Sequence, residues 1–134
     1  MQSTMQDFPL TIAAIMRHAD AVHADRTVST ANGDGTFRRA TYREVIARGA
    51  RLAQALRRLD ITGDERVATF MWNNQEHLEA YLAIPAMGAV LHTLNIRLFP
   101  EQIEFIAYEA EDRVVIADLS LAPILAPVLP KMET

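Results

Sequence analysis

The sequence predicts an α/β fold in which parallel strands alternate with helices. Two apolar runs, 66–71 and 90–94, flank a helical pattern, and a connection of this length joins parallel strands. Neither run alternates apolar and polar residues, so we expect both strands to be buried on two faces. A third apolar run, 114–117, follows another helical segment. Since strands and helices alternate in this order, we expect a parallel sheet with helices on both faces.

The composition is that of an ordinary globular protein. Of the 134 residues, 50% are hydrophobic and 22% are charged, and the net charge of −4 disfavours nucleic-acid binding. The chain has no cysteine, which excludes disulfides and thiolate metal sites within it and fits a reducing compartment. We see no signal peptide, and the longest apolar stretch, 80–94, is too short to span a bilayer. We therefore expect a cytoplasmic protein without a transmembrane segment, for which peripheral membrane contact stays open.

A helix and a β-hairpin are expected before the first core strand. Thr11–Ala24 suits a helix with Thr11 as N-cap, and its thin apolar stripe needs a partner surface. Strands at 27–31 and 36–40 flank Asn32-Gly33-Asp34-Gly35, whose residues accept the positive φ of hairpin turns. These glycines neither open a helix nor precede a Lys-Ser/Thr pair, so a phosphate loop is disfavoured.

A long amphipathic helix is expected to follow the hairpin. Thr41 and Glu44 have the spacing of a capping box, and the apolar pattern continues to about Leu59. We expect its inner stripe to be Tyr42, Val45, Ile46, Gly49, Leu52, Ala53, Leu56 and Leu59. The arginines at 43, 48, 51, 57 and 58 lie mostly off this stripe. We interpret them as a solvated face rather than as a patch that binds an anionic surface or nucleic acid.

The core stretch and the segment after it have clear helix signals. Asn73–Asn74 offers an N-cap, Gly88 ends the central helix, and Pro100 suits the first turn of the next one. For the central helix, the apolar residues at helical spacing are Leu78, Tyr81, Leu82 and Pro85. For the next, the expected inner stripe is Ile103, Ile106, Ala107 and Ala110, and Asp112 ends it. A turn at 118–120 and a short helix at 121–129 complete the pattern.

The residue types that usually carry chemistry form no catalytic or metal motif. No two of His18, His23, His77 and His92 have the spacing of a helical metal site. We expect His92 to be a hydrogen-bonded core histidine, and His77 to be exposed or partly packed. The acidic residues on helix faces and ends are expected to be solvated: Glu76, Glu79, Glu101, Glu104, Glu109, Glu111 and Asp112. The sequence therefore predicts no catalytic residue and no metal ligand.

The segment Asn95-Ile96-Arg97-Leu98 is a candidate ligand contact. It follows the second core strand at its carboxyl end, where open α/β sheets hold ligands. Arg97 could meet a phosphate there. Alternatively, Asn95 makes a turn and Arg97 pairs with a surface carboxylate. Both interpretations stay open.

Several segments between Thr11 and Asp118 together carry a family resemblance. They are Gly63-Asp64-Glu65-Arg66-Val67-Ala68, Asn73-Asn74, Glu76-His77, Ala80-Tyr81-Leu82-Ala83, Gly88-Ala89-Val90-Leu91-His92-Thr93-Leu94-Asn95 and Arg97-Leu98-x-Pro100-Glu101. In this order and spacing they resemble the N-terminal part of the adenylate-forming acyl-CoA synthetases. The phrase GAVLHTLNIRLFPEQIEFIAYEAEDRVVIAD is most similar to the medium- and long-chain fatty-acid–CoA ligase branch, and Thr41-Tyr42 also matches the start of the family's first long helix.

The resemblance implies a two-step ligase. Such enzymes use ATP and Mg²⁺ to convert a fatty acid to an acyl-adenylate, and then pass the acyl group to the thiol of coenzyme A. Residues 1–134 would be an N-terminal fragment of the AMP-binding domain, an incomplete portion of the family's large N-terminal domain. The family's phosphate loop, its adenine and ribose motifs and its C-terminal lysine would lie downstream. We therefore expect the chain alone to be inactive, to bind none of these cofactors tightly, and to serve as scaffold and dimer surface.

Two contacts are carried over from the resemblance. Asn95 and Arg97 align with a region that lies beside the nucleotide end of coenzyme A in some relatives. Residues 1–24 are a candidate arm for a homodimer contact. One alternative from another class is a standalone interaction module, or a truncated paralogue that pairs with a full-length ligase. A small doubly wound nucleotide-binding domain is a weaker alternative, because no glycine loop follows the first core strand.

Overall fold

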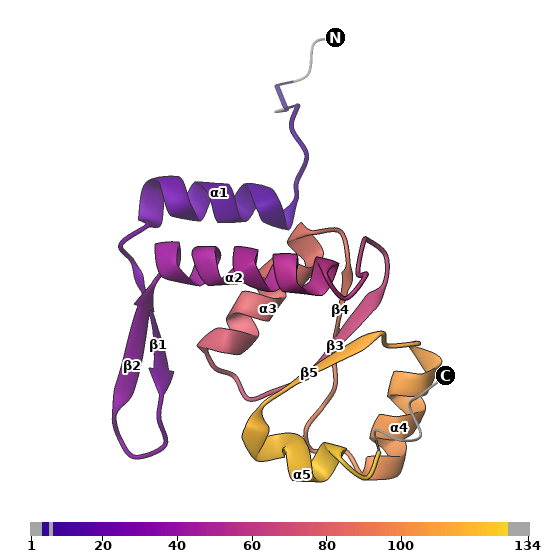
Figure 1. Ribbon diagram of the computed structural model, residues 1–134. Coiled ribbons are helices and arrows are strands. Elements are labelled where there is room, and N and C mark those ends of the chain that lie inside the picture. Colours follow the sequence, from indigo (N-terminus) through magenta and orange to yellow (C-terminus); the bar gives the residue numbers. More distant parts are fainter. Residues whose placement is uncertain (1–3, 6, 129–134) are drawn as a thin grey trace.

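The computed structural model describes residues 4–5 and 7–128, which form a parallel sheet with helices on both faces and a separate hairpin (Figure 1). The elements in chain order are α1 (Ile12–His23), β1 (Thr27–Ala31), β2 (Phe37–Thr41), α2 (Tyr42–Arg57), β3 (Arg66–Phe70), α3 (Gln75–Ala86), β4 (Val90–Thr93), α4 (Pro100–Glu109), β5 (Val114–Ala117), the 3₁₀ turn η1 (Leu119–Leu121) and α5 (Ala122–Leu125). The predicted α/β class and parallel core strands are confirmed.

The main sheet has the strand order β4-β3-β5, and β3 pairs in parallel with both neighbours. Because β3 is central, its residues Val67 to Phe70 are all buried. The expectation that the second core strand is buried on both faces is wrong, since β4 has exposed and half-buried residues only. The strand β5 is half-buried along its length. Both are edge strands of the described sheet, and an edge strand has one neighbour fewer to cover it.

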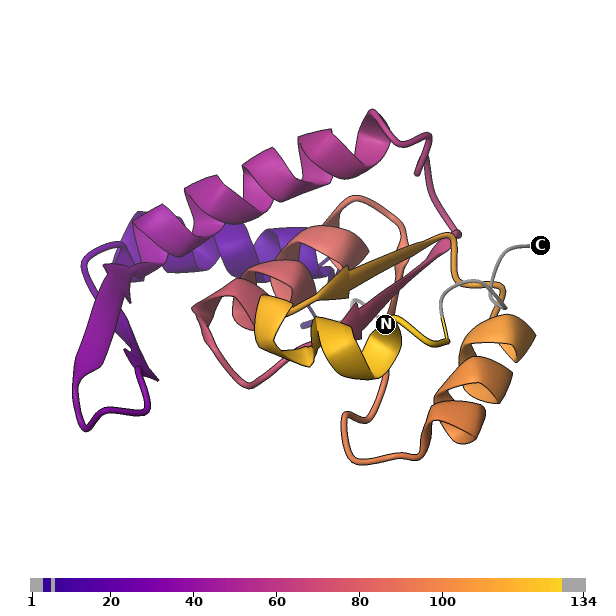
Figure 2. The ribbon, with the colours of Figure 1, turned by 60° about the horizontal axis from the view of Figure 1, so that its bottom comes forward.

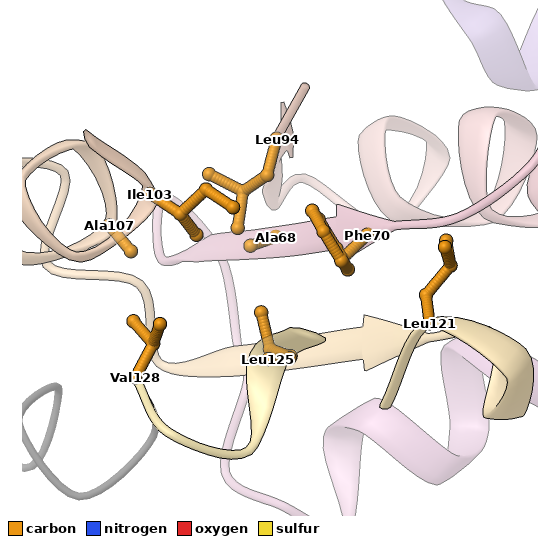
Figure 3. Packing of buried hydrophobic residues seen from close by; sticks show 8 residues of the cluster. All are labelled: Ala68, Phe70, Leu94, Ile103, Ala107, Leu121, Leu125 and Val128. Carbon is orange, nitrogen blue, oxygen red and sulfur yellow. The ribbon is translucent and has the colours of Figure 1, made fainter. Parts of the chain in front are cut away.

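Successive residues of β3 point into two different hydrophobic cores, as the pleat of a strand requires. Val67 belongs to the core that α2 and α3 cover, with Leu56, Ile61, Ala80, Ile84 and Ala89. Ala68 and Phe70 belong to the core on the opposite face, shown in Figure 3, with Leu94, Ile103, Ala107, Leu121, Leu125 and Val128. Figure 2 shows α4 and α5 on this second side of the sheet, away from α2. The carboxyl ends of the three strands are therefore held between two packed layers.

The hairpin and the long helix after it follow the predicted local signals. The strands β1 and β2 pair antiparallel, and β2 lies one residue later than expected. Gly33 and Gly35 have positive φ in the turn, as a hairpin requires. The Thr41 side chain accepts from the Glu44 N–H, and the Glu44 carboxylate reaches back to Thr41, so the capping box is confirmed.

The inner faces of α2 and α3 are only partly those expected. In α2 the buried residues are Val45, Gly49, Ala53 and Leu56. Leu59 is exposed, because the helix has already ended at Arg57. In α3 the buried residues are Gln75, His77, Glu79, Ala80, Ala83 and Ile84, whereas Tyr81 of the predicted stripe is 46% exposed. The small residues Ala80 and Ala83 are buried because α3 lies between α2 and the sheet.

The outer helices differ from each other in how they are packed. Thr11 caps α1, which lies along α2 and buries none of its own residues (Figure 1). The helix α4 begins at Pro100 as predicted but ends at Glu109, before Asp112. The expected short helix at 121–129 is limited to α5, and residue 129 lies outside the described residues. No helix in the described part of the chain is long and apolar enough to cross a membrane.

Candidate functional site

The carboxyl edge of the β4-β3-β5 sheet gathers three chain segments that follow its strands. These are residues 71–74 after β3, 94–98 after β4 and 118–120 after β5. Parallel α/β sheets bind ligands at this edge, because strand ends leave loops and helix N-termini there. The segment after β4 contains the predicted contacts, and the other two segments are joined by side-chain hydrogen bonds.

The Asp118 carboxylate links the segments after β5 and β3. It accepts a hydrogen bond from the Trp72 backbone N–H at 2.7 Å. The Asn74 side-chain amide also donates to it, at 3.2 and 3.3 Å. The Asn74 side-chain oxygen in turn accepts from the His77 N–H and caps α3, as predicted for this segment. Hydrogen bonds thus join the side chains at this edge into one polar cluster, of which the sequence predicted only the Asn74 cap.

The indole of Trp72 is oriented by a further hydrogen bond from this edge. Its Nε1–H donates to the Ser120 hydroxyl at 3.0 Å. Although it is held in this way, Trp72 remains 51% exposed. Trp72, Asp118 and Ser120 were not predicted as site residues. Their signal in the sequence is position alone, since they lie two, one and three residues after the end of a core strand.

His77 is buried, so the expectation of an exposed or partly packed side chain is wrong. Its Nε2 lies 2.9 Å from the Thr69 hydroxyl, and its Nδ1 lies 3.1 Å from the Trp72 carbonyl oxygen. A carbonyl oxygen only accepts, so Nδ1 donates to Trp72, and Nε2 is hydrogen-bonded to the Thr69 hydroxyl. Both ring nitrogens therefore have a partner. His77 holds the chain after β3 in place.

Asn95 and Arg97 are both exposed in the segment after β4. The Asn95 side-chain oxygen accepts from the Arg97 N–H at 3.0 Å, and its carbonyl oxygen accepts from the Leu98 N–H at 3.2 Å. Asn95 therefore makes a turn, as one of the two interpretations expected. The surface carboxylate expected for Arg97 is not found, since its guanidinium forms no salt bridge within residues 7–128. Its charge is available to an anion.

A second polar cluster joins the hairpin, α2 and α3, away from this edge. The Arg48 Nε donates to the Glu79 carboxylate at 2.7 Å, and Arg38 forms a bidentate pair with Glu76. The expectation that Glu79 is solvated is wrong, because this residue is only 5% exposed. Arg48, which was expected on a solvated face, forms an ion pair with it. The hydrogen bond from Arg38 lowers the pKa of Glu76 below its usual value. These contacts hold the hairpin, α2 and α3 together.

His92 and Asp112 form a third polar contact, between β4 and the turn before β5. The His92 Nδ1 lies 2.9 Å from an Asp112 carboxylate oxygen, so the predicted hydrogen-bonded histidine is confirmed, although a quarter of its side chain is exposed. The Asp112 side chain is fully buried, which corrects the expectation that it is solvated. Burial raises the pKa of Asp112, and the hydrogen bond from His92 acts in the opposite direction. This pair also connects elements.

Within residues 4–5 and 7–128, no three His, Asp or Glu side chains come together as a group that could hold a metal ion. The carboxyl edge, with one carboxylate that is already hydrogen-bonded to Trp72 and Asn74, has no such set of donors. What the edge does offer is an exposed aromatic ring and an unpaired cation.

Comparison with known proteins assigns the chain to a family. The model of the family described as "AMP-binding enzyme" matches residues 16–134, which is most of the chain. The chain belongs to the AMP-binding enzymes. The resemblance noted in the sequence is thereby confirmed, including its fatty-acid–CoA ligase branch, because fatty-acid–CoA ligases are among the most similar relatives.

Two relatives and one solved structure define the similarity of this AMP-binding chain. It is 39% identical to a medium-chain-fatty-acid–CoA ligase of Ectopseudomonas oleovorans, over 99% of this chain and 25% of the relative. It is 40% identical to a long-chain-fatty-acid–CoA ligase of Thermus thermophilus, over 98% of this chain and 24% of the relative. The crystal structure of the N-terminal domain of FACL13 from Mycobacterium tuberculosis superposes with a TM-score of 0.81, at 26% identity, over 90% of this chain and 30% of that one.

The AMP-binding chain spans about a quarter of the length of the curated relatives it matches. The chain contributes the β4-β3-β5 sheet, the helices that cover this sheet and the hairpin. At the carboxyl edge of the sheet, Trp72, Asn74, Asp118 and Ser120 form one hydrogen-bonded cluster.

Proposed function

We propose that the protein to which this chain belongs is a fatty-acid–CoA ligase. It joins a fatty acid to AMP at the expense of ATP, releasing pyrophosphate, and then transfers the acyl group to the thiol of coenzyme A. The observation that carries the proposal is the 39–40% identity to two fatty-acid–CoA ligases along almost the whole chain. The substrate is a fatty acid of medium or long chain, and the protein acts in the cytoplasm.

The role proposed for this chain is structural and substrate-positioning. Asn95 and Arg97 contact the nucleotide end of coenzyme A, whose phosphates carry the negative charge that an unpaired guanidinium binds. This contact is supported by the exposure of both residues and by the lack of a salt bridge at Arg97 within the described residues. Mg²⁺ would neutralise the triphosphate of ATP. No residue of this chain is proposed to hold it.

A homodimer contact is proposed for residues 1–24. The described helix of this segment, α1, is amphipathic but buries none of its residues. Ile15 and Val22 are each more than half exposed on it. A second copy of the protein would cover such a helix. The chain by itself is proposed to be inactive.

The experiment that tests the ligase proposal is an assay of the whole protein. It should exchange labelled pyrophosphate into ATP only when a medium- or long-chain fatty acid is present, and form acyl-CoA when coenzyme A is added. Arg97→Gln should raise the KM for coenzyme A and leave the acid-dependent exchange unchanged, because the exchange does not involve coenzyme A. No fatty-acid-dependent exchange by the folded wild-type protein would refute the proposal.

The surface offers an observation against the standalone interaction module. Large apolar side chains stay exposed beside the β5 edge of the sheet and on α4, among them Phe105, Tyr108 and Leu119. A finished small domain would cover most of this surface. The ligase proposal accounts for it, because the relatives have about four times the length of this chain.

A further inference from the structure

Trp72 is held in one orientation although half of it is exposed. All three of its polar groups are hydrogen-bonded: its backbone N–H donates to Asp118, its carbonyl oxygen accepts from His77, and its indole N–H donates to Ser120. An exposed surface tryptophan normally has freedom about its side-chain bonds, and it loses that freedom here. Five residues from two stretches of the chain, 69–77 and 118–120, take part in this arrangement, including the buried Thr69 behind His77.

The exposed ring lies where a ligand is expected. Trp72 follows the central strand β3 at the carboxyl edge of the parallel sheet. Its neighbours at this edge are the turn at Asn95 after β4 and Asp118 after β5. The adjoining residues Asn73 and Ser120 are exposed as well. A pre-oriented aromatic face at this edge is suited to a planar ring, because little entropy is lost when the ring stacks.

We propose that Trp72 is a stacking platform for the adenine ring of a nucleotide co-substrate. The proposal rests on the proposed function for the choice of adenine, which both ATP and coenzyme A carry. Stacking between a base and an aromatic side chain requires no hydrogen bond to the base edge, so the single fixed indole face suffices. Asp118, His77 and Ser120 then act as positioning residues that keep the face turned outward.

The test measures binding and kinetics in the whole protein with Trp72→Leu and Trp72→Phe. Loss of the ring in Trp72→Leu should raise the Kd and KM for one adenine-bearing co-substrate by ~5- to 100-fold, with little change in kcat. Trp72→Phe should keep most of the affinity because it keeps an aromatic face. Phe37→Leu is the matched control, since Phe37 is an exposed aromatic on the hairpin strand β2 and not on this edge. Its Kd values should equal those of the wild type.

The probes are coenzyme A, ATP and pantetheine, which has the thiol arm of coenzyme A without the adenine. An effect of Trp72→Leu on coenzyme A assigns the platform to the thiol substrate, and an effect on ATP assigns it to the first half-reaction. Pantetheine should bind the variant and the wild type equally. Kd values within twofold of the wild type for both coenzyme A and ATP would overturn the proposal.

Fluorescence gives a measurement that does not depend on the folding of Trp72→Leu. Trp72 is the one tryptophan of this chain, so the difference in emission between the wild type and Trp72→Phe isolates its signal. Coenzyme A or ATP should quench this signal saturably, whereas pantetheine should not. Ser120→Ala removes the hydrogen bond to the indole N–H but keeps the ring. It should raise the Kd of the ligand that quenches the signal a few-fold. A Trp72 signal that no adenine compound changes would overturn the platform, even in a protein with full ligase activity; an inactive wild type would refute the ligase proposal instead.

Discussion

Thr69 and His77 form a buried polar pair between β3 and α3. Thr69 is fully buried between apolar residues of the strand, and its hydroxyl is hydrogen-bonded to the His77 ring. The other ring nitrogen of His77 bonds the Trp72 carbonyl oxygen. Buried ring nitrogens need hydrogen-bond partners, so the Thr69 hydroxyl helps to fix the position of His77.

Thr69→Val tests this dependence. Valine has nearly the same shape as threonine but leaves the His77 Nε2 buried without a hydrogen-bond partner, so the free energy of unfolding should fall by ~1–3 kcal/mol. Thr27→Val is the control, because Thr27 is an exposed strand residue of β1. It should change the free energy by less than ~0.5 kcal/mol. Urea unfolding of both variants measures the difference, and equal values for the two would contradict the role given to Thr69.

At the residue scale, the sequence predicted the contacts that are local in the chain. The Thr41–Glu44 box and the Asn74 cap connect residues three positions apart, so spacing alone reveals them. The Trp72–Asp118 contact joins residues 46 positions apart, and no spacing rule covers it. Its existence depends on the pairing of β3 with β5. For the same reason, the Asn95 turn was one of the two interpretations that the sequence left open, whereas the Trp72 cluster was not predicted.

At the scale of elements, α2 and α3 pack closely at Gly49. A Cβ atom built on Gly49 would lie 3.5 Å from the Glu79 carbonyl oxygen and 3.7 Å from the Ala83 Cβ. These are ordinary contact distances, so the site has room for one methyl group and no more. This close approach fits the small Ala83 where α3 meets α2. The apolar pattern of α3 did not predict this, because hydrophobicity does not register the advantage of small size.

Gly49→Ala should stabilise the protein. Alanine fills the available space and has the higher helix propensity, so the free energy of unfolding should rise by ~0.5–1 kcal/mol. Gly88→Ala is the opposing case, because Gly88 has φ +98° after α3, where a side chain is strained. It should lower the free energy by ~1–3 kcal/mol. Thermal melts of the two variants measure the signs, and a destabilising Gly49→Ala would disprove the packing described for α2 and α3.

The Arg38–Glu76 pair, which joins the hairpin to α3, should make stability depend on pH. Arg38 lowers the pKa of Glu76 in the folded state, so the pair contributes stability above the ordinary glutamate pKa. That contribution is lost as the pH falls through the lowered pKa. Arg38→Gln should therefore cost less than ~1 kcal/mol at neutral pH, since both side chains are a third or more exposed and screened by solvent.

In acid, below the pKa of Glu76 in the folded protein, Arg38→Gln and the wild type should become equally stable. Arg39→Gln is the matched control from the same strand, as Arg39 is exposed and forms no salt bridge in the described residues. Denaturant unfolding across the acid range measures both variants. A difference between Arg38→Gln and the wild type that persists unchanged in acid would show that the pair acts through packing rather than charge.

At the scale of the whole molecule, the alternation of strands and helices was sufficient to predict the fold class. The three parallel strands and the helices on both faces follow from it. The extent of burial did not follow, because an apolar run has the same composition in a central strand as in an edge strand. The strand β3 is central and buried, whereas β4 and β5 are half-covered at the edges. Strand order, which decides this, is not written in the local pattern.

The chain alone should have no ligase activity. It matches only about a quarter of the length of the fatty-acid–CoA ligases to which it is similar. Expressed as residues 1–134 and checked for helix content by circular dichroism, it should give no acid-dependent exchange of pyrophosphate into ATP. The whole protein, assayed beside it, is the positive control. Measurable exchange by the folded 134-residue chain would contradict the scaffold role proposed for it.

The central claim is that this chain is part of a larger ligase, and one mass measurement tests it directly. The intact protein can be captured from its source cell through a peptide from residues 66–98 and weighed by mass spectrometry. Because the relatives are about four times as long, the mass should be about four times the 15.0 kDa of this chain. A mass of 15.0 kDa would mean that the cell keeps only this piece, and would contradict the ligase account in favour of a binding or regulatory role.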